Sequence, residues 1–254
     1  MSQRLQRLEQ AAGGRLLVRG AHGTRLTEPG ERLLAYAERM LALHDQARTA
    51  VEGGDEGPAG RRAIGLLEDL AITTLPAVLA DFAVLHPRIE LEVVIGPAIE
   101  LRRLSDQGRL DLVFGDPIVM SGAALRWERR VPLVWAAAPG LDPLADPLPL
   151  VLFSQPCQWR QPALDALDRH GRHWRVAFQS TSVHAVQAAI SAGIGVGALP
   201  AANLPPGAAR LSASHGLPAA PTVDIAISRR ADTDTDPALT SLEQLLRRAA
   251  SASD

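Results

Sequence analysis

Residues 2–10 of the chain are SQRLQRLEQ and residues 15–34 are RLLVRGAHGTRLTEPGERLL, and these two segments predict the architecture of the N-terminal end. In the first segment Leu5 and Leu8 are three residues apart, so they share one face of a helix, and glutamine and arginine cover the rest. The pattern predicts a short amphipathic helix that ends near Gly13, because glycine interrupts helices.

The second segment predicts two short strands joined by a tight turn and followed by a helix. Residues 15–19 form the expected first strand, and residues 21–24 contain a glycine suited to the turn. The chain returns through Arg25, and Thr27 is placed to cap the next helix, with Pro29 in its first turn. Helix, hairpin and helix in this order are typical of the second half of a winged helix-turn-helix.

The polar side chains of this region suit contact with double-stranded DNA. Arginine pairs with guanine and glutamine with adenine, and arginines also neutralise phosphates. The alternative is an ordinary solvated helix face, which the same residue types favour. The candidate DNA-binding residues are Ser2, Gln3, Arg4, Gln6, Arg7, Arg19, His22, Thr24 and Arg25.

The segments SQRLQRLEQ, GRLLVR and GTRLTEPGERLL resemble the DNA-binding end of the LysR-type transcriptional regulators. The resemblance implies that residues 2–10 are the recognition helix and that residues 1–27 are a partial winged helix-turn-helix. Members of that family begin earlier, with the first helices of the motif. We therefore expect the coding sequence upstream of Met1 to continue in frame. In a truncated chain, the alternative is a stand-alone small-molecule-binding protein that has lost DNA binding.

Composition and charge fit a protein whose N-terminal end alone meets nucleic acid. The chain has 254 residues, 46% of them hydrophobic, and a net charge of −2. Residues 1–48 hold eight Arg against five acidic residues, so they carry +3 and the remainder carries −5. The sequence shows no signal peptide and no apolar run of membrane-spanning length. A single cysteine, Cys157, fits a cytoplasmic protein.

Residues 28–52 predict one long helix with a heptad seam. Leu33, Ala37, Met40, His44, Ala47 and Val51 recur at spacings of three and four. Such a seam packs against a partner helix or against its own domain. The resemblance favours a dimerising linker helix, and with it a homodimer or homotetramer. Residues 53–60, rich in glycine, predict a flexible linker.

From residue 61 onward the pattern is α/β. Strands are predicted at 62–67, 89–95, 110–114, 133–138, 150–153, 174–178, 196–199 and 223–227, and helices at 75–85, 99–107, 162–170, 183–192 and 239–248. This alternation predicts parallel sheets, and residues 249–254 are expected to be disordered. The segment from LPAVLADFAVLHPRIELEVVIG onward resembles the effector-binding domain of the same family. The resemblance implies a two-lobed, periplasmic-binding-protein-like fold with lobe I at 61–135 and 228–254 and lobe II at 136–227.

Ligands of open α/β lobes bind beyond the carboxyl ends of strands, near helix N-termini. This rule predicts an effector site between the lobes, formed by Glu68, Asp69, Pro97, Ala98, Asp116, Cys157, Trp159, Ser180 and Ser182. The wider family often has a hydroxyl residue where Glu68 and Asp69 stand, so two acids argue against a simple carboxylate effector. Cys157 is a ligand contact, a thiol sensor or a small buried residue. The segment from Pro156 to Arg175 is similar to the LrhA and HexA branch of the family.

Enzyme, metal and cofactor functions are not expected. The glycine-rich segment 193–197 follows a helix and precedes a strand, the reverse of a dinucleotide-binding loop. His170 and His173 lack a third ligand at a typical metal spacing. No serine nucleophile motif or catalytic pair of carboxylates is present. A third alternative, an enzyme on the same two-lobed scaffold, would be detected by turnover of a bound ligand.

Overall fold

The computed structural model of this chain describes residues 3–20, 23–30, 32–34, 37, 58–117, 124–155 and 157–252. The chain divides into an N-terminal unit, residues 1–57, and a larger unit that takes in most of residues 58–254. Among the helices described, none has the length and apolar character needed to cross a membrane.

The N-terminal unit contains the predicted helix and hairpin. Helix α1 spans Gln3–Ala12, and strands β1 (Leu17–Gly20) and β2 (Gly23–Leu26) pair antiparallel, with Val18 opposite Arg25. Leu5 is half-buried and Leu8 is 48% exposed, so α1 buries little of its apolar face within this unit. The helix and wing predicted from the sequence are therefore confirmed as elements.

Two side chains fix the geometry of this unit. The Glu9 carboxylate on α1 accepts the backbone N–H groups of Leu16 (2.9 Å) and Leu17 (3.3 Å), which ties the helix to the start of β1. The Thr27 hydroxyl accepts the Gly30 N–H at 3.1 Å, as predicted for the cap of the next helix. That helix is described at residues 28–30 and 32–34. Most of the predicted heptad seam, including His44, lies outside the described residues.

The first lobe of the larger unit is built on a twisted sheet. Its strands are β3 (Gly60–Leu66), β4 (Ile89–Ile95), β5 (Leu112–Gly115), β6 (Ala124–Ala137) and β11 (Thr222–Arg229). Its helices are α3 (Glu68–Leu85), α4 (Ala98–Asp106) and α7 (Pro237–Ala252). With β10 (Ala209–Leu211) at one edge, the sheet runs β10-β6-β11-β5-β3-β4. Strand β3 lies between β5 and the edge strand β4, and its second half is buried and apolar.

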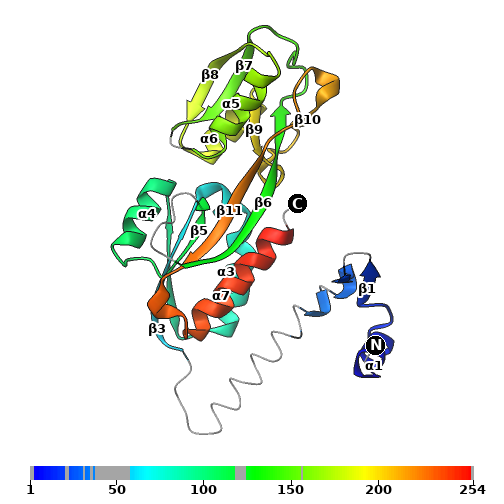
Figure 1. Cartoon of the computed structure of the whole chain (residues 1–254), viewed down its shortest axis with the longest axis vertical. Coiled ribbons are helices and arrows are strands. Elements are labelled where there is room, and N and C mark those ends of the chain that lie inside the picture. Colours follow the sequence, from blue (N-terminus) through cyan, green and yellow to red (C-terminus); the bar gives the residue numbers. More distant parts are fainter. Residues whose placement is uncertain are drawn as a thin grey trace. The chain divides into compact units, whose positions relative to one another are not determined.

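The second lobe contains a smaller parallel pair, β7 (Leu148–Phe153) and β8 (Trp174–Ser180). Helices α5 (Arg160–Arg169) and α6 (Val183–Ser191) accompany it, together with β9 (Gly197–Pro200), β10 (Ala209–Leu211) and the short 3-10 helices η2 (Ala201–Asn203) and η3 (Ala213–His215). Strand β6 pairs with β11 in its first part and with β9 and β10 near its end. It therefore runs from one lobe into the other (Figure 1).

Two expectations about this unit were wrong. The sheet of the first lobe is mixed, because β11 runs antiparallel to both β5 and β6 where it crosses back between lobes. Residues 249–252, expected to be disordered, continue α7, and Ala250 is buried. The apolar face of α7 persists to this residue, and its burial orders the last turn.

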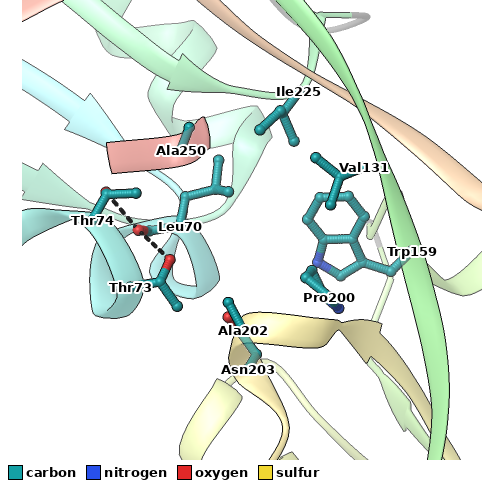
Figure 2. A pocket seen from close by; sticks show the side chains of 10 residues that line it. All are labelled: Leu70, Thr73, Thr74, Val131, Trp159, Pro200, Ala202, Asn203, Ile225 and Ala250. Atoms are coloured by element: carbon teal, nitrogen blue, oxygen red, sulfur yellow. Dashed lines mark hydrogen bonds between the residues drawn. The ribbon is translucent and has the colours of Figure 1, made fainter. Parts of the chain in front are cut away.

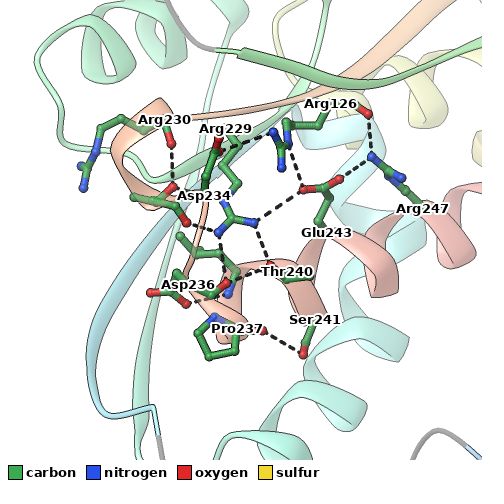
Figure 3. A network of polar contacts seen from close by, with 12 residues as sticks. Arg126, Arg229, Arg230, Asp234, Asp236, Pro237, Thr240, Ser241, Glu243 and Arg247 are labelled. Carbon is green, nitrogen blue, oxygen red and sulfur yellow. Dashed lines mark hydrogen bonds and ion pairs between the residues drawn. The ribbon is translucent and has the colours of Figure 1, made fainter.

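A buried ion network joins α7 to the end of β11. Arg229 is almost completely buried, and its guanidinium donates to the Thr240 hydroxyl (3.0 Å) and to the carbonyls of Asp236 (3.0 Å) and Thr233. Its Nη1 also lies 3.8 Å from the carboxylate of Glu243, which Arg126 and Arg247 flank (Figure 3). Three arginines thus compensate one buried glutamate, as burial of a charge requires.

Candidate functional site

The candidate site lies between the two lobes and begins at the first turn of α3. Glu68 of the first lobe accepts the Ser182 hydroxyl (3.2 Å) and the Val183 backbone N–H (3.1 Å) of the second lobe. Val183 is the first residue of α6, so this N–H has no partner within its own helix. Glu68 therefore caps a helix of the opposite lobe with a full negative charge, which the helix N-terminus favours.

Asp69, the next residue, lies deeper. It is 5% exposed, and within the part of the chain that the structure describes its Oδ2 has no hydrogen-bond partner. Burial raises its pKa to about 6; backbone N–H groups and the Trp159 side chain oppose the rise, and the charge of Glu68 adds to it. The Asp69 carbonyl accepts the amide of Asn203 at 3.0 Å, a second link between the lobes.

Cys157 and Trp159 precede α5 on the second-lobe side. Burial raises the pKa of the Cys157 thiol to about 12; the backbone N–H groups of Trp159 and Arg160 oppose this, and the charge of Asp69 raises it further. A raised pKa argues against the thiol sensor, because the thiolate is the reactive form, and the Cys157 side chain is half-buried. Arg160 also lies here, and its Nη1 donates to the Phe153 carbonyl at 2.8 Å.

Beside these groups is a small apolar pocket of about 30 Å³, room for one or two water molecules. Both lobes and both crossing strands supply its walls, which are Leu70, Thr73, Thr74, Val131, Trp159, Pro200, Ala202, Asn203, Ile225 and Ala250. Figure 2 shows the Trp159 indole beside Pro200, across the pocket from α3. The hydroxyls of Thr73 and Thr74 donate to the Leu70 carbonyl, so neither proton is directed to a ligand.

The structure brings together most of the nine residues predicted for the effector site. Glu68 contacts Ser182, whose backbone N–H donates to the Ser180 hydroxyl at 3.1 Å. Asp116 is buried at the end of β5, within 3.3 Å of the Gln158 amide, which donates to it when its nitrogen faces the carboxylate. Asp69, Cys157 and Trp159 interact as described above.

Pro97 and Ala98 are the exceptions. They begin α4, and the Pro97 carbonyl accepts the N–H groups of Glu100 and Leu101 on the same helix. Pro97 is exposed. The contacts described for these two residues stay within the first lobe, because the loop after β4 lies at the edge strand of the sheet, well away from β6.

Sequence reasoning missed most of the pocket walls. Leu70, Thr73 and Thr74 share one face of α3 through their spacing of three and four, but the sequence predicts this helix only from Leu75 onward. Val131, Ile225 and Ala250 had no signal in the sequence, since only the crossing of β6, β11 and α7 brings them together. Asn203 lies just after β9 of the second lobe, so the rule that places Asp116 in the effector site also applies to Asn203, which the prediction for that site does not include.

The predicted DNA-binding residues divide by position. Gln3, Arg4, Gln6 and Arg7 are exposed on α1, and Thr24 and Arg25 are exposed on β2. Arg19 lies opposite Thr24 in the hairpin. Ser2 and His22 lie outside the described residues. Helix and wing thus present exposed polar side chains of the types that contact bases and phosphates.

Comparison with known proteins agrees with this architecture. The family model for the LysR substrate binding domain matches residues 55–251. The HTH-type transcriptional regulator DgdR of Burkholderia cepacia is 35% identical over 228 residues, covering 89% of this chain and 76% of that protein. PecT of Dickeya dadantii, also an HTH-type transcriptional regulator, is 29% identical over 243 residues, covering 93% and 74%.

Solved structures share the fold at lower identity. CrgA from Neisseria meningitidis, a LysR-type transcriptional regulator, has a TM-score of 0.62 at 19% identity, covering 96% of this chain and 87% of that one. A full-length OxyR variant from Pseudomonas aeruginosa has a TM-score of 0.59 at 19% identity, covering 96% and 83%. A winged-helix segment followed by a two-lobed α/β domain defines a ligand-responsive transcriptional regulator. The chain belongs to the LysR family of these regulators.

Proposed function

We infer that this chain binds double-stranded DNA through α1 and the β1–β2 wing, and that a small molecule bound between its lobes controls that binding. The observation that carries the inference is the direct contact of Glu68 with the start of α6. A ligand that breaks this contact on entering favours an open arrangement of the lobes, and a ligand that keeps it favours the closed one. In either case the ligand binds the two arrangements with different affinity. Such differential affinity is what regulation requires.

Several finer points belong to the same proposal. The helix predicted from the sequence at 28–52 would pair two copies of the chain, which gives a homodimer or a homotetramer in the cytoplasm. The bounds proposed from the sequence are 61–135 and 228–254 for lobe I, 136–227 for lobe II and 53–60 for the linker. In the structure β6 and β11 cross between the lobes, and β3 begins at Gly60. The protein is a regulator and not an enzyme, and it needs no metal or cofactor. Similarity to the LrhA and HexA branch stays a prediction.

The effector function is tested on the purified full-length gene product. Small molecules that co-purify or that raise the melting temperature are identified by mass spectrometry and thermal shift. Fluorescence anisotropy then measures binding to a DNA fragment from its own promoter region, with and without each compound. A compound that binds yet leaves DNA affinity unchanged at all concentrations contradicts control by that compound. If no DNA fragment is bound specifically, the chain is a ligand-binding protein alone.

The two DNA-contacting elements should differ in their response to mutation. Arg25→Ala in the wing should weaken binding to every sequence and reduce the slope of log K against log salt by about one, as for a phosphate contact. Gln3→Ala or Arg4→Ala on α1 should cost about 1–3 kcal/mol at the specific site and relax base preference. Fluorescence anisotropy at several salt concentrations measures both.

Arg130→Ala is the matched control for loss of one arginine. Arg130 is exposed on β6, where it pairs with Asp224 at 3.1 Å. We expect this variant to keep wild-type affinity and salt slope. Equal losses on specific and random DNA for Gln3→Ala, Arg4→Ala and Arg25→Ala would reject the division of roles between helix and wing.

A further inference from the structure

The N-terminus of α6 already holds a carboxylate from the protein itself. Both Glu68 oxygens are used: Oε1 accepts the Ser182 hydroxyl at 3.2 Å and Oε2 accepts the Val183 N–H at 3.1 Å. Oε1 also lies 3.4 Å from Nδ1 of His184. Helix N-termini bind anions through such free N–H groups. Glu68 occupies the position that a carboxylate of a ligand would take.

Several of the nearby donors are already used within the protein, whereas among the described residues the buried Nε of Arg160 has no acceptor. The Ser182 backbone N–H is accepted by the Ser180 hydroxyl, and the Asn203 amide donates to the Asp69 carbonyl. Asp69, next to Glu68 in the chain, is itself a carboxyl, and its buried Oδ2 has no hydrogen-bond partner among the described residues. An organic anion here would meet two carboxyl groups at short range, and repulsion between like charges is strong where water is excluded.

The adjoining pocket is apolar. Leu70, Val131 and Ile225 supply much of its wall, with Trp159 opposite α3 (Figure 2). A buried carboxyl beside such a wall suits a ligand with an apolar body, and an N–H or O–H donor would satisfy the unpartnered oxygen of Asp69. The charge and the apolar surface thus select the same kind of molecule.

We propose that Glu68 is a specificity-determining residue: it acts as a tethered anion on α6, excludes organic anions from this end of the cleft, and restricts the effector to uncharged or cationic molecules with an apolar body. The proposal rests on the proposed function, in which the cleft between the lobes receives the effector. It predicts that removing the Glu68 carboxylate creates an anion site where none was open.

The backbone amide of Val183 reports directly on this site. The ¹⁵N-labelled 254-residue chain is titrated with sodium propionate at constant ionic strength, with propionamide as the uncharged isostere. In the wild type we expect no saturable shift of the Val183 resonance. In Glu68→Ala we expect a saturable shift with propionate alone, with a dissociation constant in the millimolar range. Glu68→Gln, which removes the charge and keeps the shape, is the second variant should Glu68→Ala fold poorly.

Glu92→Ala is the matched control, because Glu92 on β4 is a carboxylate paired with Arg61 away from α6. It should behave as the wild type does. Propionate binding to the wild type as tightly as to the Glu68 variants overturns the proposal, and so does failure of both variants to bind propionate. Neither result tests whether an effector controls DNA binding, because the anisotropy experiment measures that separately. Conversely, a gain of propionate binding supports the role of Glu68 even if no effector alters DNA affinity.

Discussion

Replacing Arg229 with methionine is expected to lower the free energy of unfolding by about 3–5 kcal/mol, because it breaks a buried charge network by removing one partner. The side chain is fully buried and lies 3.8 Å from the carboxylate of Glu243. Its loss also removes the guanidinium as a donor to the Thr240 hydroxyl and as one of the donors to the Asp236 carbonyl. Urea unfolding followed by circular dichroism measures the change.

Two further variants decide how to interpret that loss. Arg130→Met removes an arginine whose side chain is 71% exposed in its pair with Asp224, and it should cost less than about 1 kcal/mol. Arg229→Lys keeps the charge but loses the planar fork of donors, so it should fall between the two. A cost for Arg229→Met no larger than that for Arg130→Met would show that the buried network contributes little to stability.

The second large expected effect is a change with pH in the free energy of unfolding, caused by Asp69. The folded pKa of Asp69 is about 6 and its ordinary value is 3.8. A carboxyl whose pKa is raised by folding destabilises the protein when ionised, and it stops doing so as falling pH protonates the folded state. The full difference corresponds to about 3 kcal/mol, of which about 1.4 kcal/mol is recovered between pH 8 and pH 5.

Asp69→Asn removes this dependence. The difference in the free energy of unfolding, Asp69→Asn minus wild type, should be larger at pH 8 than at pH 5 by about 1.4 kcal/mol, so the variant is relatively more stable at the higher pH. A constant cost for burying the amide cancels in this comparison. Glu92→Gln removes a carboxylate on the edge strand β4 instead. Its free energy of unfolding relative to the wild type should show no comparable difference between pH 5 and pH 8. Parallel curves for Asp69→Asn and wild type between pH 5 and pH 8 would mean that Asp69 titrates alike in the folded and unfolded chains.

Local patterns in the sequence predicted most elements, and long-range contacts decided the rest. Ile89–Ile95 was predicted residue for residue because β-branched and alternating apolar residues mark a strand. Only the end of β6 was predicted, because residues 124–132 contain three arginines and a glutamate. Those charges meet partners that lie far along the chain. Arg126 pairs with Glu243, and Arg130 with Asp224.

The predicted start of helix α3 was wrong, and this affects the description of the candidate site. It was predicted from Leu75 onward, because Thr73, Thr74 and Pro76 all disfavour a helix interior. It begins at Glu68, and the two threonines donate their hydroxyls to carbonyls of the preceding turn. Glu68 and Asp69 therefore stand in the first turn of a helix and not in a loop. The sequence placed both residues at the cleft, but the capping of α6 by Glu68 follows only from the approach of the two lobes.

Strand β6 affects how the effector domain unfolds. Residues 124–132 pair with β11 in the first lobe, and residues 133–137 pair with β9 and β10 in the second. Unfolding of one lobe removes a paired strand from the other, so we expect the two lobes to unfold in a single transition. We therefore expect a compound that stabilises the closed cleft to protect residues throughout the domain from proteolysis, including those that it does not contact.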